Sequence, residues 1–173
     1  MSKTIDRNIF LIGFMGAGKS TIARSLQKSL KFPLVEMDER IVREQGMSIN
    51  EIFEKYGEDH FRDIESELIL TIGKEGTSIV SCGGGVVVRP QNVENMKKSG
   101  MIVFLKATSE TIYERVKNST DRPILNGHMN VEYIAQLMEK RRTLYEGAAD
   151  ITIETDGKTK EEICREIIGR LEE

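Results

Sequence analysis

The chain has 173 residues, of which 39% are hydrophobic, and this supports one domain with a full core. Its 25 basic and 28 acidic residues leave a net charge of −3, which argues against broad binding to nucleic acid or to an anionic membrane. Two cysteines are too few for a disulfide framework, and two histidines argue against a zinc site. No apolar run is close to the length of a membrane span, which is about 20 residues. We therefore expect a cytoplasmic protein that acts as a monomer.

Five short apolar runs, taken in chain order, are predicted to be strands: residues 8–12, 33–37, 78–82, 101–106 and 150–154. Because Ile, Val, Leu and Phe follow one another in them without strict alternation, they fit strands that are covered on both faces. The stretches between the strands carry apolar residues at helical spacing, as at Ile22, Ala23, Leu26 and Leu30. This alternation predicts a single α/β domain with a parallel sheet and right-handed crossovers.

Two stretches interrupt the alternation. Residues 38–74 look entirely helical, which is more than one crossover needs, so part of them is predicted to form an insertion beside the sheet. Within this stretch Ser48 and Glu51 predict a capping box at the start of a helix. Residues 117–130 are polar and rich in turn formers, which indicates a loop that is either simply solvated or functional.

The segment from Gly13 to Ser20 reads GFMGAGKS and matches the pattern G-x-x-x-x-G-K-[ST] in full, between a predicted strand and a predicted helix. In such a loop, backbone N–H groups surround phosphate, and the helix N-terminus adds partial positive charge. Lys19 then reaches the β/γ-phosphates, and the Ser20 hydroxyl can ligate Mg²⁺. The motif therefore predicts a site for a nucleoside triphosphate or a close relative, in preference to a merely structural glycine turn.

Carboxylates and arginines beyond this loop are candidates for an acceptor site. Glu36 and Asp38 stand two residues apart at the end of the second predicted strand, facing the ligand crevice of a parallel sheet. One could support Mg²⁺ through water and the other could accept a proton from an acceptor hydroxyl, or both could be solvated charges. On a helix Glu65 faces inward, and Arg62 can pair with it, either as a structural ion pair or as an arginine held to meet a carboxylate.

The third predicted strand ends in Cys82 and three glycines, Gly83–Gly85. Cys82 is expected to pack as a small apolar residue. The glycines either expose backbone N–H groups to a ligand that approaches closely or form a plain tight turn.

Three arginines in the second half of the chain are also candidates. In the predicted helix 131–146, Arg141 lies at the centre of an apolar stripe that includes Leu144 and Tyr145, which is unusual unless it meets an anion or lines a cleft. Arg115 and Arg122 bracket the polar loop, and either could be a lid arginine that stabilises a transferring phosphate. For Arg115 a solvated helix charge fits at least as well.

These elements together resemble the shikimate kinase family over most of the chain, roughly from Asn8 to the last helix. The phosphate loop is shared by many kinases, whereas the Phe-Arg-x-x-Glu element, the triple glycine and the Arg-x-x-Leu-Tyr run in this order are much more specific. The segments that carry the resemblance are GFMGAGKST (13–21), EMD (36–38), SINEIFEKYGEDHFRDIE (48–65), SCGGGVV (81–87), DRPIL (121–125) and RRTLY (141–145).

The resemblance implies an α/β fold of the P-loop, nucleoside-monophosphate-kinase-like type, with five parallel strands in the order 2-3-1-4-5. It implies transfer of the γ-phosphate of ATP, with Mg²⁺ as cofactor, to the 3-hydroxyl of shikimate on the route to aromatic amino acids. The insertion at about residues 38–74 would bind shikimate, and residues 117–130 would form the lid.

The same resemblance implies the roles of individual residues. Asp38 would contact shikimate hydroxyls and is a candidate to take the proton, while Arg62, Arg141 and the Gly84 backbone would bind the carboxylate side. Arg122 would reach over the phosphates from the lid. Arg115 would stack on adenine, and Lys158, near the C-terminus, would make a further nucleotide contact. Ser20 would bind Mg²⁺. The phosphates of ATP would be held by the residues of the phosphate loop: Gly16, Ala17, Gly18, Lys19, Ser20 and Thr21.

The chain departs from the family pattern at Glu36 and in the segment after Asp156 (GKTKEE), which lacks the usual polar nucleotide-contact pattern around Lys158. Family members commonly have Asp where this chain has Glu36, whose extra methylene can shift water-mediated Mg²⁺ geometry. Arg62 and Arg141 favour a carboxylate or phosphate acceptor in general, so a gluconate-type or nucleoside-monophosphate kinase is the rival within kinases. A nucleotide-dependent regulatory module without turnover is the rival in another class, although binding alone would not need Asp38.

Overall fold

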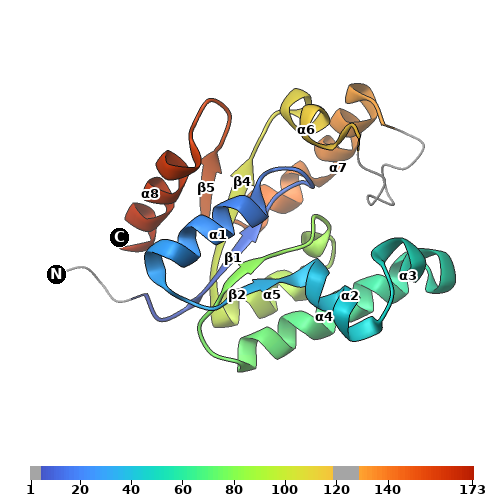
Figure 1. The fold of residues 1–173 in the computed structure, drawn as a ribbon, viewed down its shortest axis with the longest axis horizontal. Coiled ribbons are helices and arrows are strands. Elements are labelled where there is room, and N and C mark those ends of the chain that lie inside the picture. The colour runs from blue at the N-terminus through green and yellow to red at the C-terminus, as the bar shows by residue number, and fades with distance from the viewer. Residues whose placement is uncertain (1–4, 119–128) are drawn as a thin grey trace.

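Five parallel strands form one sheet in the order β2-β3-β1-β4-β5 (Figure 1). In this computed structural model, residues 5–118 and 129–173 are described. The central strand β1 pairs with β3 on one side, where Ile9 lies opposite Ile79, and with β4 on the other, where Ile9 lies opposite Met101. The predicted strand order and direction are confirmed. The strands are β1 (Asn8–Ile12), β2 (Leu34–Glu36), β3 (Ile79–Ser81), β4 (Gly100–Lys106) and β5 (Ile151–Glu154).

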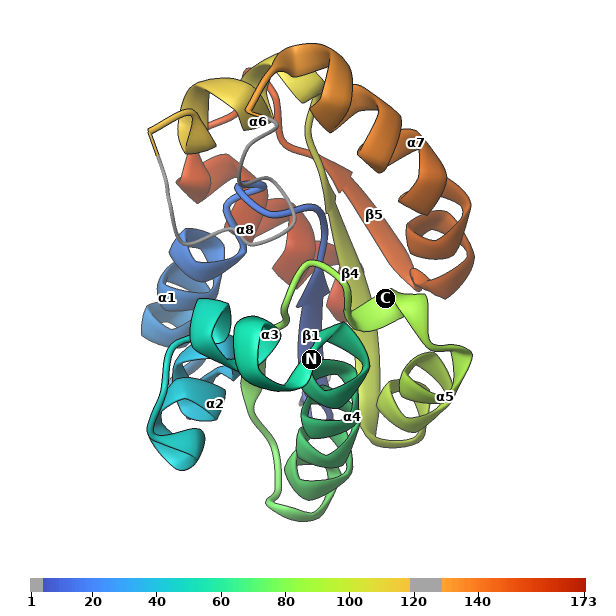
Figure 2. The same ribbon diagram turned by 90° about the vertical axis from the view of Figure 1, so that its right-hand side faces the viewer.

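Helices cover both faces of the sheet. Helices α1 and α8 pack together on one face, and α5 and α7 lie on the other (Figure 2). None of the helices in the described part of the chain has the length and apolar character that a bilayer span requires. The helices are α1 (Lys19–Leu30), α2 (Met37–Gln45), α3 (Ile49–Tyr56), α4 (Glu58–Lys74), α5 (Pro90–Ser99), α6 (Ser109–Val116), α7 (Val131–Ala148) and α8 (Lys160–Leu171), with a 3₁₀ turn, η1, at Val86–Val88.

The predicted helical stretch 38–74 consists of α2, α3 and α4. Gly46 ends α2 at φ 68°, and Gly57 separates α3 from α4 at φ 86°, a left-handed region that favours glycine. The predicted capping box is confirmed, because the Glu51 backbone N–H donates to Ser48 Oγ at 3.1 Å and the Ser48 N–H donates to Glu51 Oε1 at 3.3 Å. Two short helices and one long one therefore replace a single crossover helix.

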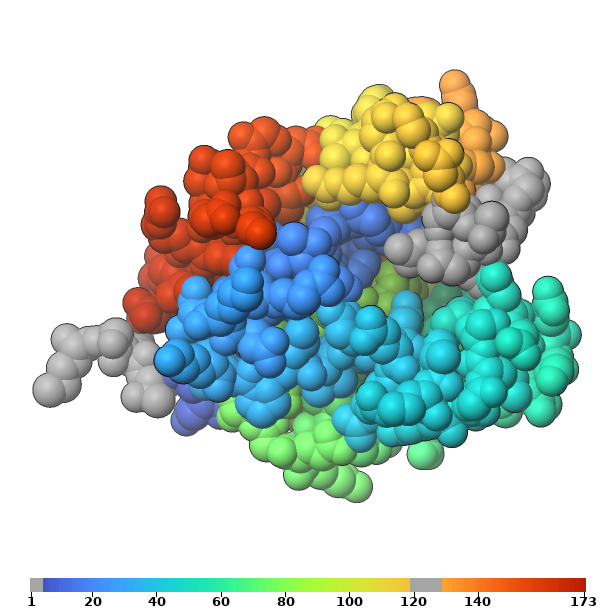
Figure 3. Space-filling view, in the orientation of Figure 1, coloured from blue at the N-terminus to red at the C-terminus, as the bar shows by residue number. Residues whose placement is uncertain are grey.

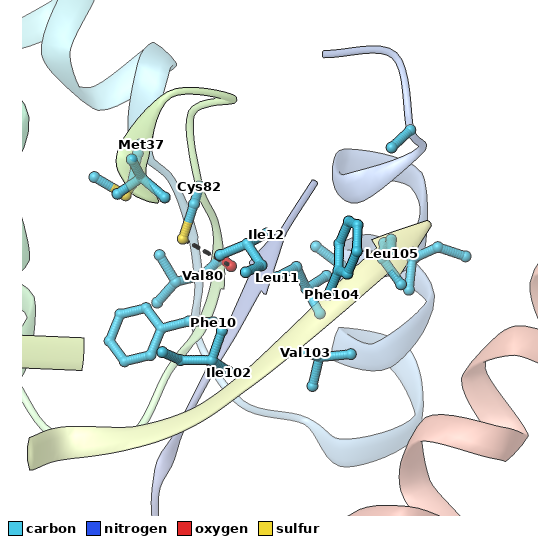
Figure 4. Packing of buried hydrophobic residues seen from close by; sticks show 14 of the residues in the cluster. Phe10, Leu11, Ile12, Met37, Val80, Cys82, Ile102, Val103, Phe104 and Leu105 are labelled. Atoms are coloured by element: carbon cyan, nitrogen blue, oxygen red, sulfur yellow. Dashed lines mark hydrogen bonds between the residues drawn. The ribbon is translucent and has the colours of Figure 1, made fainter. Parts of the chain in front are cut away.

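The core is one cluster of buried apolar side chains from the sheet and the helices on both faces. Figure 4 shows Phe10 and Ile12 of β1 beside Val80 of β3 and Ile102 of β4. Each such fully buried side chain contributes about 1.5–3 kcal/mol to folding relative to an exposed one. As expected, Cys82 packs among these residues as a small buried group.

The burial of α7 differs in one respect from the prediction. Arg141 and Tyr145 are 6% and 2% exposed, as expected for the centre of the buried stripe, but Leu144 is 38% exposed. Neighbouring residues on a helix lie about 100° apart, so the stripe that carries Arg141 and Tyr145 leaves Leu144 on its flank. The prediction that Leu144 belongs to the buried stripe was wrong.

Candidate active site

A cleft of about 790 Å³ opens where the parallel strands end at their carboxyl side. In Figure 3 the phosphate loop, in blue, lies between helix α6, in yellow, and the α2–α3 segment, in cyan. The cleft brings together residues that were predicted separately for phosphate, metal and acceptor binding. Its wall includes Gly16, Gly18, Lys19, Ser20, Thr21, Glu36, Asp38, Gly84 and Arg115.

The loop between β1 and α1 is wound around the side chain of Lys19. The ammonium Nζ donates to the carbonyl oxygens of Gly13 at 2.6 Å and of Phe14 at 3.0 Å. Gly16 and Gly18 have φ angles of 82° and 96°, which let the backbone turn so tightly. The lysine charge is thus held inside the curl of the loop, beside the place where this motif binds phosphate.

At the edge of this loop, Ser20 contacts two neighbouring strand ends. Its hydroxyl donates to Glu36 Oε2 at 2.8 Å and lies 3.4 Å from Ser81 Oγ. The other carboxylate oxygen, Glu36 Oε1, is buried and has no hydrogen-bond partner in the described structure, with Arg24 Nη1 3.9 Å away.

Hydroxyl and carboxylate oxygens are ligand types that Mg²⁺ prefers. Within residues 5–118 and 129–173 there is no group of three or more His, Cys, Asp or Glu side chains that could hold a metal by themselves. Ser20, with the available Glu36 Oε1 beside it, fits an ion whose remaining ligands are water and phosphate oxygens. The donor set therefore suits Mg²⁺ that arrives with a nucleotide.

The two predicted acidic residues, Glu36 and Asp38, both line the cleft, but not for the predicted reason. The prediction placed them on one face of a strand, whereas β2 ends at Glu36 and Asp38 lies in the first turn of α2. Because α2 begins directly after β2, with Glu36 as its N-cap, the short step from strand to helix still brings both carboxylates to the same edge of the sheet.

Behind this edge lies a cluster of buried charged side chains. Arg62, Glu65 and Arg141 are all less than 10% exposed. Arg62 Nη1 donates to Glu65 Oε1 at 3.1 Å, and Arg62 Nη2 donates to Glu58 Oε1 at 3.2 Å. Three polar atoms of the cluster are buried without a hydrogen-bond partner in the described structure: Arg62 Nε, Glu65 Oε2 and Arg141 Nη1.

A buried polar group without a hydrogen-bond partner destabilises the folded protein by about 1–3 kcal/mol, and a charged group by more. Two of the three are arginine donors and one is a carboxylate acceptor. Together they fit a small ligand that carries an anionic group and a hydroxyl. The pKa of Glu65 is raised to about 7 because burial disfavours its charged form, and the charge of Asp38 adds to the rise while Arg62 and Arg141 oppose it.

The triple-glycine turn after β3 passes close to this cluster. A Cβ atom on Gly83 would lie 2.8 Å from Glu65 Oε2 and 3.0 Å from Asp38 Oδ1, and a Cβ atom on Gly85 would collide with the guanidinium of Arg62. These glycines therefore let charged side chains approach the backbone closely, which a single-glycine turn would not allow.

The shikimate kinase family model matches residues 15–172 of the chain. The chain belongs to the shikimate kinase family. A shikimate kinase from Thermodesulfovibrio yellowstonii is 45% identical over 166 residues, which cover 96% of this chain and 95% of that protein.

Solved shikimate kinase structures agree with this membership. The structure of the shikimate kinase from Acinetobacter baumannii in complex with shikimate has a TM-score of 0.91 at 31% identity, and the match covers 95% of this chain and 92% of that one. The shikimate kinase from Aquifex aeolicus has a TM-score of 0.81 at 38% identity, with 95% and 96% covered. The predicted family and the predicted nucleoside-monophosphate-kinase-like fold are confirmed.

Three further residues predicted for the shikimate kinase site differ in where they lie. Arg115, in α6, borders the cleft, and its Nη1 donates to the Gly16 carbonyl oxygen at 2.9 Å. Lys158 lies between β5 and α8 and pairs with Glu166 at 2.9 Å, so its nucleotide contact stays a prediction. Arg122, with most of the predicted lid, lies outside the described residues.

Two residues that contact groups at the cleft were not identified from the sequence as functional candidates. Ser81 ends β3 and touches the Ser20 hydroxyl, and Tyr145 donates a hydrogen bond from its hydroxyl to the Gly84 carbonyl oxygen. The position of Ser81 beside the triple glycine, and the spacing of Tyr145 four residues after Arg141, are the signals that could have identified them.

Proposed function

We propose that this chain transfers the γ-phosphate of ATP to the 3-hydroxyl of shikimate, giving shikimate 3-phosphate and ADP. The observation that carries the proposal is the buried cluster of Arg62, Glu65 and Arg141, whose unfilled hydrogen-bond positions lie beside a cleft that also holds the phosphate loop. Membership of the shikimate kinase family, and a relative whose structure was solved with shikimate, support the choice of acceptor. A small-molecule reaction of this kind suits a cytoplasmic monomer without nucleic-acid or membrane partners.

The acceptor would lie between α4, α7 and the glycine turn. Arg62 and Arg141 would bind its carboxylate through their unfilled N–H donors, which gives charge-assisted hydrogen bonds. The backbone N–H of Gly84 would face the same carboxylate side. Asp38, which lies beside Gly83 and near Glu65, would accept hydrogen bonds from the ring hydroxyls and take the proton of the hydroxyl that reacts.

The phosphates would lie along the loop of residues 16–21, with Lys19 against the β/γ-phosphates. Ser20 would hold Mg²⁺, which supplies neutralisation of phosphate charge when it is bound, and Glu36 Oε1 would accept a hydrogen bond from its water shell. Arg115 would flank the nucleotide base, and Arg122 would meet the transferring group. Phosphoryl transfer needs mainly positioning and charge neutralisation, and these residues would provide both.

The direct test is ADP release from Mg·ATP with shikimate, compared with gluconate, with AMP and with no acceptor. We expect rapid release with shikimate alone. Equally slow release under all four conditions would overturn the proposal, and rapid release with gluconate or AMP would assign the chain to another acceptor.

An Asp38→Asn variant separates a kinase from a nucleotide-binding regulatory module. The exchange keeps the size of the side chain but removes its capacity to take a proton, so turnover should fall by about 100-fold or more while ATP affinity changes little. Asp63→Asn, at an exposed position of α4, is the matched control. Unchanged turnover in Asp38→Asn would contradict the role of Asp38.

A further inference from the structure

Among the buried residues of helix α7, Arg141 and Tyr145 lie one turn apart on the face toward the sheet. The Tyr145 hydroxyl donates a hydrogen bond to the carbonyl oxygen of Gly84, the middle residue of the triple-glycine turn. Gly84 also lies against the phosphate loop, since a Cβ atom on it would be 3.2 Å from the backbone nitrogen of Met15. Tyr145 thus connects the helix that bears Arg141 to the glycine turn, whose Gly84 lines the cleft.

The hydroxyl of Tyr145 stays protonated and available as a donor. Burial is the largest influence and raises the pKa of the Tyr145 hydroxyl above its ordinary value. Arg141 lowers this pKa, but by less than burial raises it. The hydroxyl therefore links α7, the helix that bears Arg141, to Gly84, and the proposed function assigns both Arg141 and Gly84 to the acceptor carboxylate.

Packing alone does not hold the Tyr145 ring on every side. One face stacks on Phe104 of β4, with ring centroids 5.0 Å apart and an interplanar angle of 18°. The ring also borders a separate cavity of about 230 Å³, which Phe14 and Met138 line as well. The hydroxyl bond to Gly84 adds a directional contact at the tip of the ring, which stacking on Phe104 does not supply.

The glycine turn is held in a similar way at its other end. Asn92, fully buried in α5, donates from Nδ2 to the Val86 carbonyl oxygen at 3.0 Å. Between β3 and Asn92, the turn is also closed by backbone hydrogen bonds from Val86 N–H to Gly83 O at 3.2 Å and from Val88 N–H to Gly85 O at 3.0 Å. The peptide of Gly84 depends on Tyr145 for its side-chain anchor.

We propose that Tyr145 is a positioning residue for the acceptor: its hydroxyl ties the Gly84 peptide to α7 and so fixes the spacing between the Gly84 backbone and the Arg141 guanidinium. This inference rests on the proposed function, because it assigns both groups to the carboxylate of the acceptor. Tyr145 itself acts through its neighbours and needs no contact with substrate.

The test is a Tyr145→Phe variant, which retains the ring and removes the hydroxyl. We expect the KM for shikimate to rise about tenfold, the loss of one well-placed hydrogen bond, while kcat and the KM for ATP change less than about twofold. Tyr56→Phe, at an exposed position of α3, is the matched control and should match the wild type. Thermal unfolding of each variant checks that the fold is retained.

An acceptor without a free carboxylate distinguishes positioning from general loosening. We expect the wild-type preference for shikimate over its methyl ester, measured as the ratio of kcat/KM values, to fall about tenfold in Tyr145→Phe. An unchanged ratio, or a parallel fall in kcat and in ATP affinity, would overturn the inference. Failure of the proposed function is a separate outcome, because it would appear as absence of shikimate-dependent ADP release from the wild type.

Discussion

At the scale of single residues, the cluster of buried charged side chains places Glu65 between opposing influences. Its side chain is fully buried on α4, with Arg62 and Arg141 favouring the charged form and Asp38 disfavouring it, as does burial itself. The buried thiol of Cys82 has its pKa raised by burial as well and stays neutral. Glu65 is therefore the group of this cluster that titrates near neutral pH.

The raised pKa of Glu65 predicts that the free energy of unfolding depends on pH. Its pKa of about 7 in the folded protein exceeds the ordinary 4.5, so the folded state binds the proton more tightly than the unfolded chain. The stabilisation from protonated Glu65 is fully present below about pH 4.5 and is lost as the pH rises through about 7. In urea unfolding, Glu65→Gln should match the wild type at about pH 5 and exceed its stability at about pH 8, by on the order of 1–3 kcal/mol.

Glu67→Gln, an exposed position on the same helix, serves as the control for this comparison. If the free energy of unfolding changes with pH in the same way for the wild type and for Glu65→Gln, Glu65 does not titrate between about pH 5 and pH 8.

Single-residue predictions from sequence succeeded where helical periodicity determines burial. The spacing of α4 places Glu65 inward, and that of α7 places Arg141 at the centre of the buried stripe, as the structure confirms. Periodicity could not reveal that Tyr145 bonds to Gly84, because that contact joins residues 61 positions apart. It also misplaced Asp38, because a three-residue strand that turns directly into a helix leaves no alternation to read.

At the scale of elements, the triple-glycine turn is the connection between β3 and η1 that allows Arg62 to lie against the backbone. The φ of Gly85 is −100°, a value that any residue adopts, so an alanine there is not strained by its backbone. Its methyl group would instead occupy the space of the Arg62 guanidinium. The requirement for glycine at this position is set by the packed side chain.

We therefore expect Gly85→Ala to act on the acceptor and not on the nucleotide. Displacement of Arg62 should raise the KM for shikimate by about tenfold or more, with the KM for ATP changed less than about twofold. Gly147→Ala in α7, where an added Cβ meets nothing within 4 Å, is the control and should retain wild-type kinetics. Steady-state kinetics with each substrate varied in turn decides the matter, and an unaltered KM for shikimate would refute this account of the turn.

Element types and their order could be predicted from the chain, whereas their exact limits could not. Near-continuous apolar runs identified the strands because β1, β3 and most of β4 are buried on both faces, whereas the edge strand β5 alternates buried and exposed residues. The division of residues 37–74 into three helices depends on Gly46 and Gly57, whose left-handed φ angles are dictated by how α2, α3 and α4 pack. The strand order came from the family resemblance, since alternation alone is compatible with several orders.

At the scale of the whole molecule, the helices of residues 37–74 and the sheet that carries the phosphate loop share one core. Ile41 of α2, Ile52 of α3 and Leu68 of α4 belong to the same buried cluster as Phe10 of β1. The predicted insertion is thus continuous with the sheet in packing. A shared core favours unfolding of the chain as one cooperative unit.

This predicts a single thermal transition that either substrate shifts as a whole. Shikimate at about 100 times its dissociation constant adds about 2.7 kcal/mol to the folded state, which should raise the Tm by about 5–10 °C for a domain of this size. Because the chain has no tryptophan, far-ultraviolet circular dichroism and tyrosine fluorescence are the suitable probes, and both should report the same midpoint. Gluconate at equal concentration should leave that midpoint in place. Two separate transitions, of which shikimate moves only one, would show instead that the helices 37–74 unfold independently of the sheet.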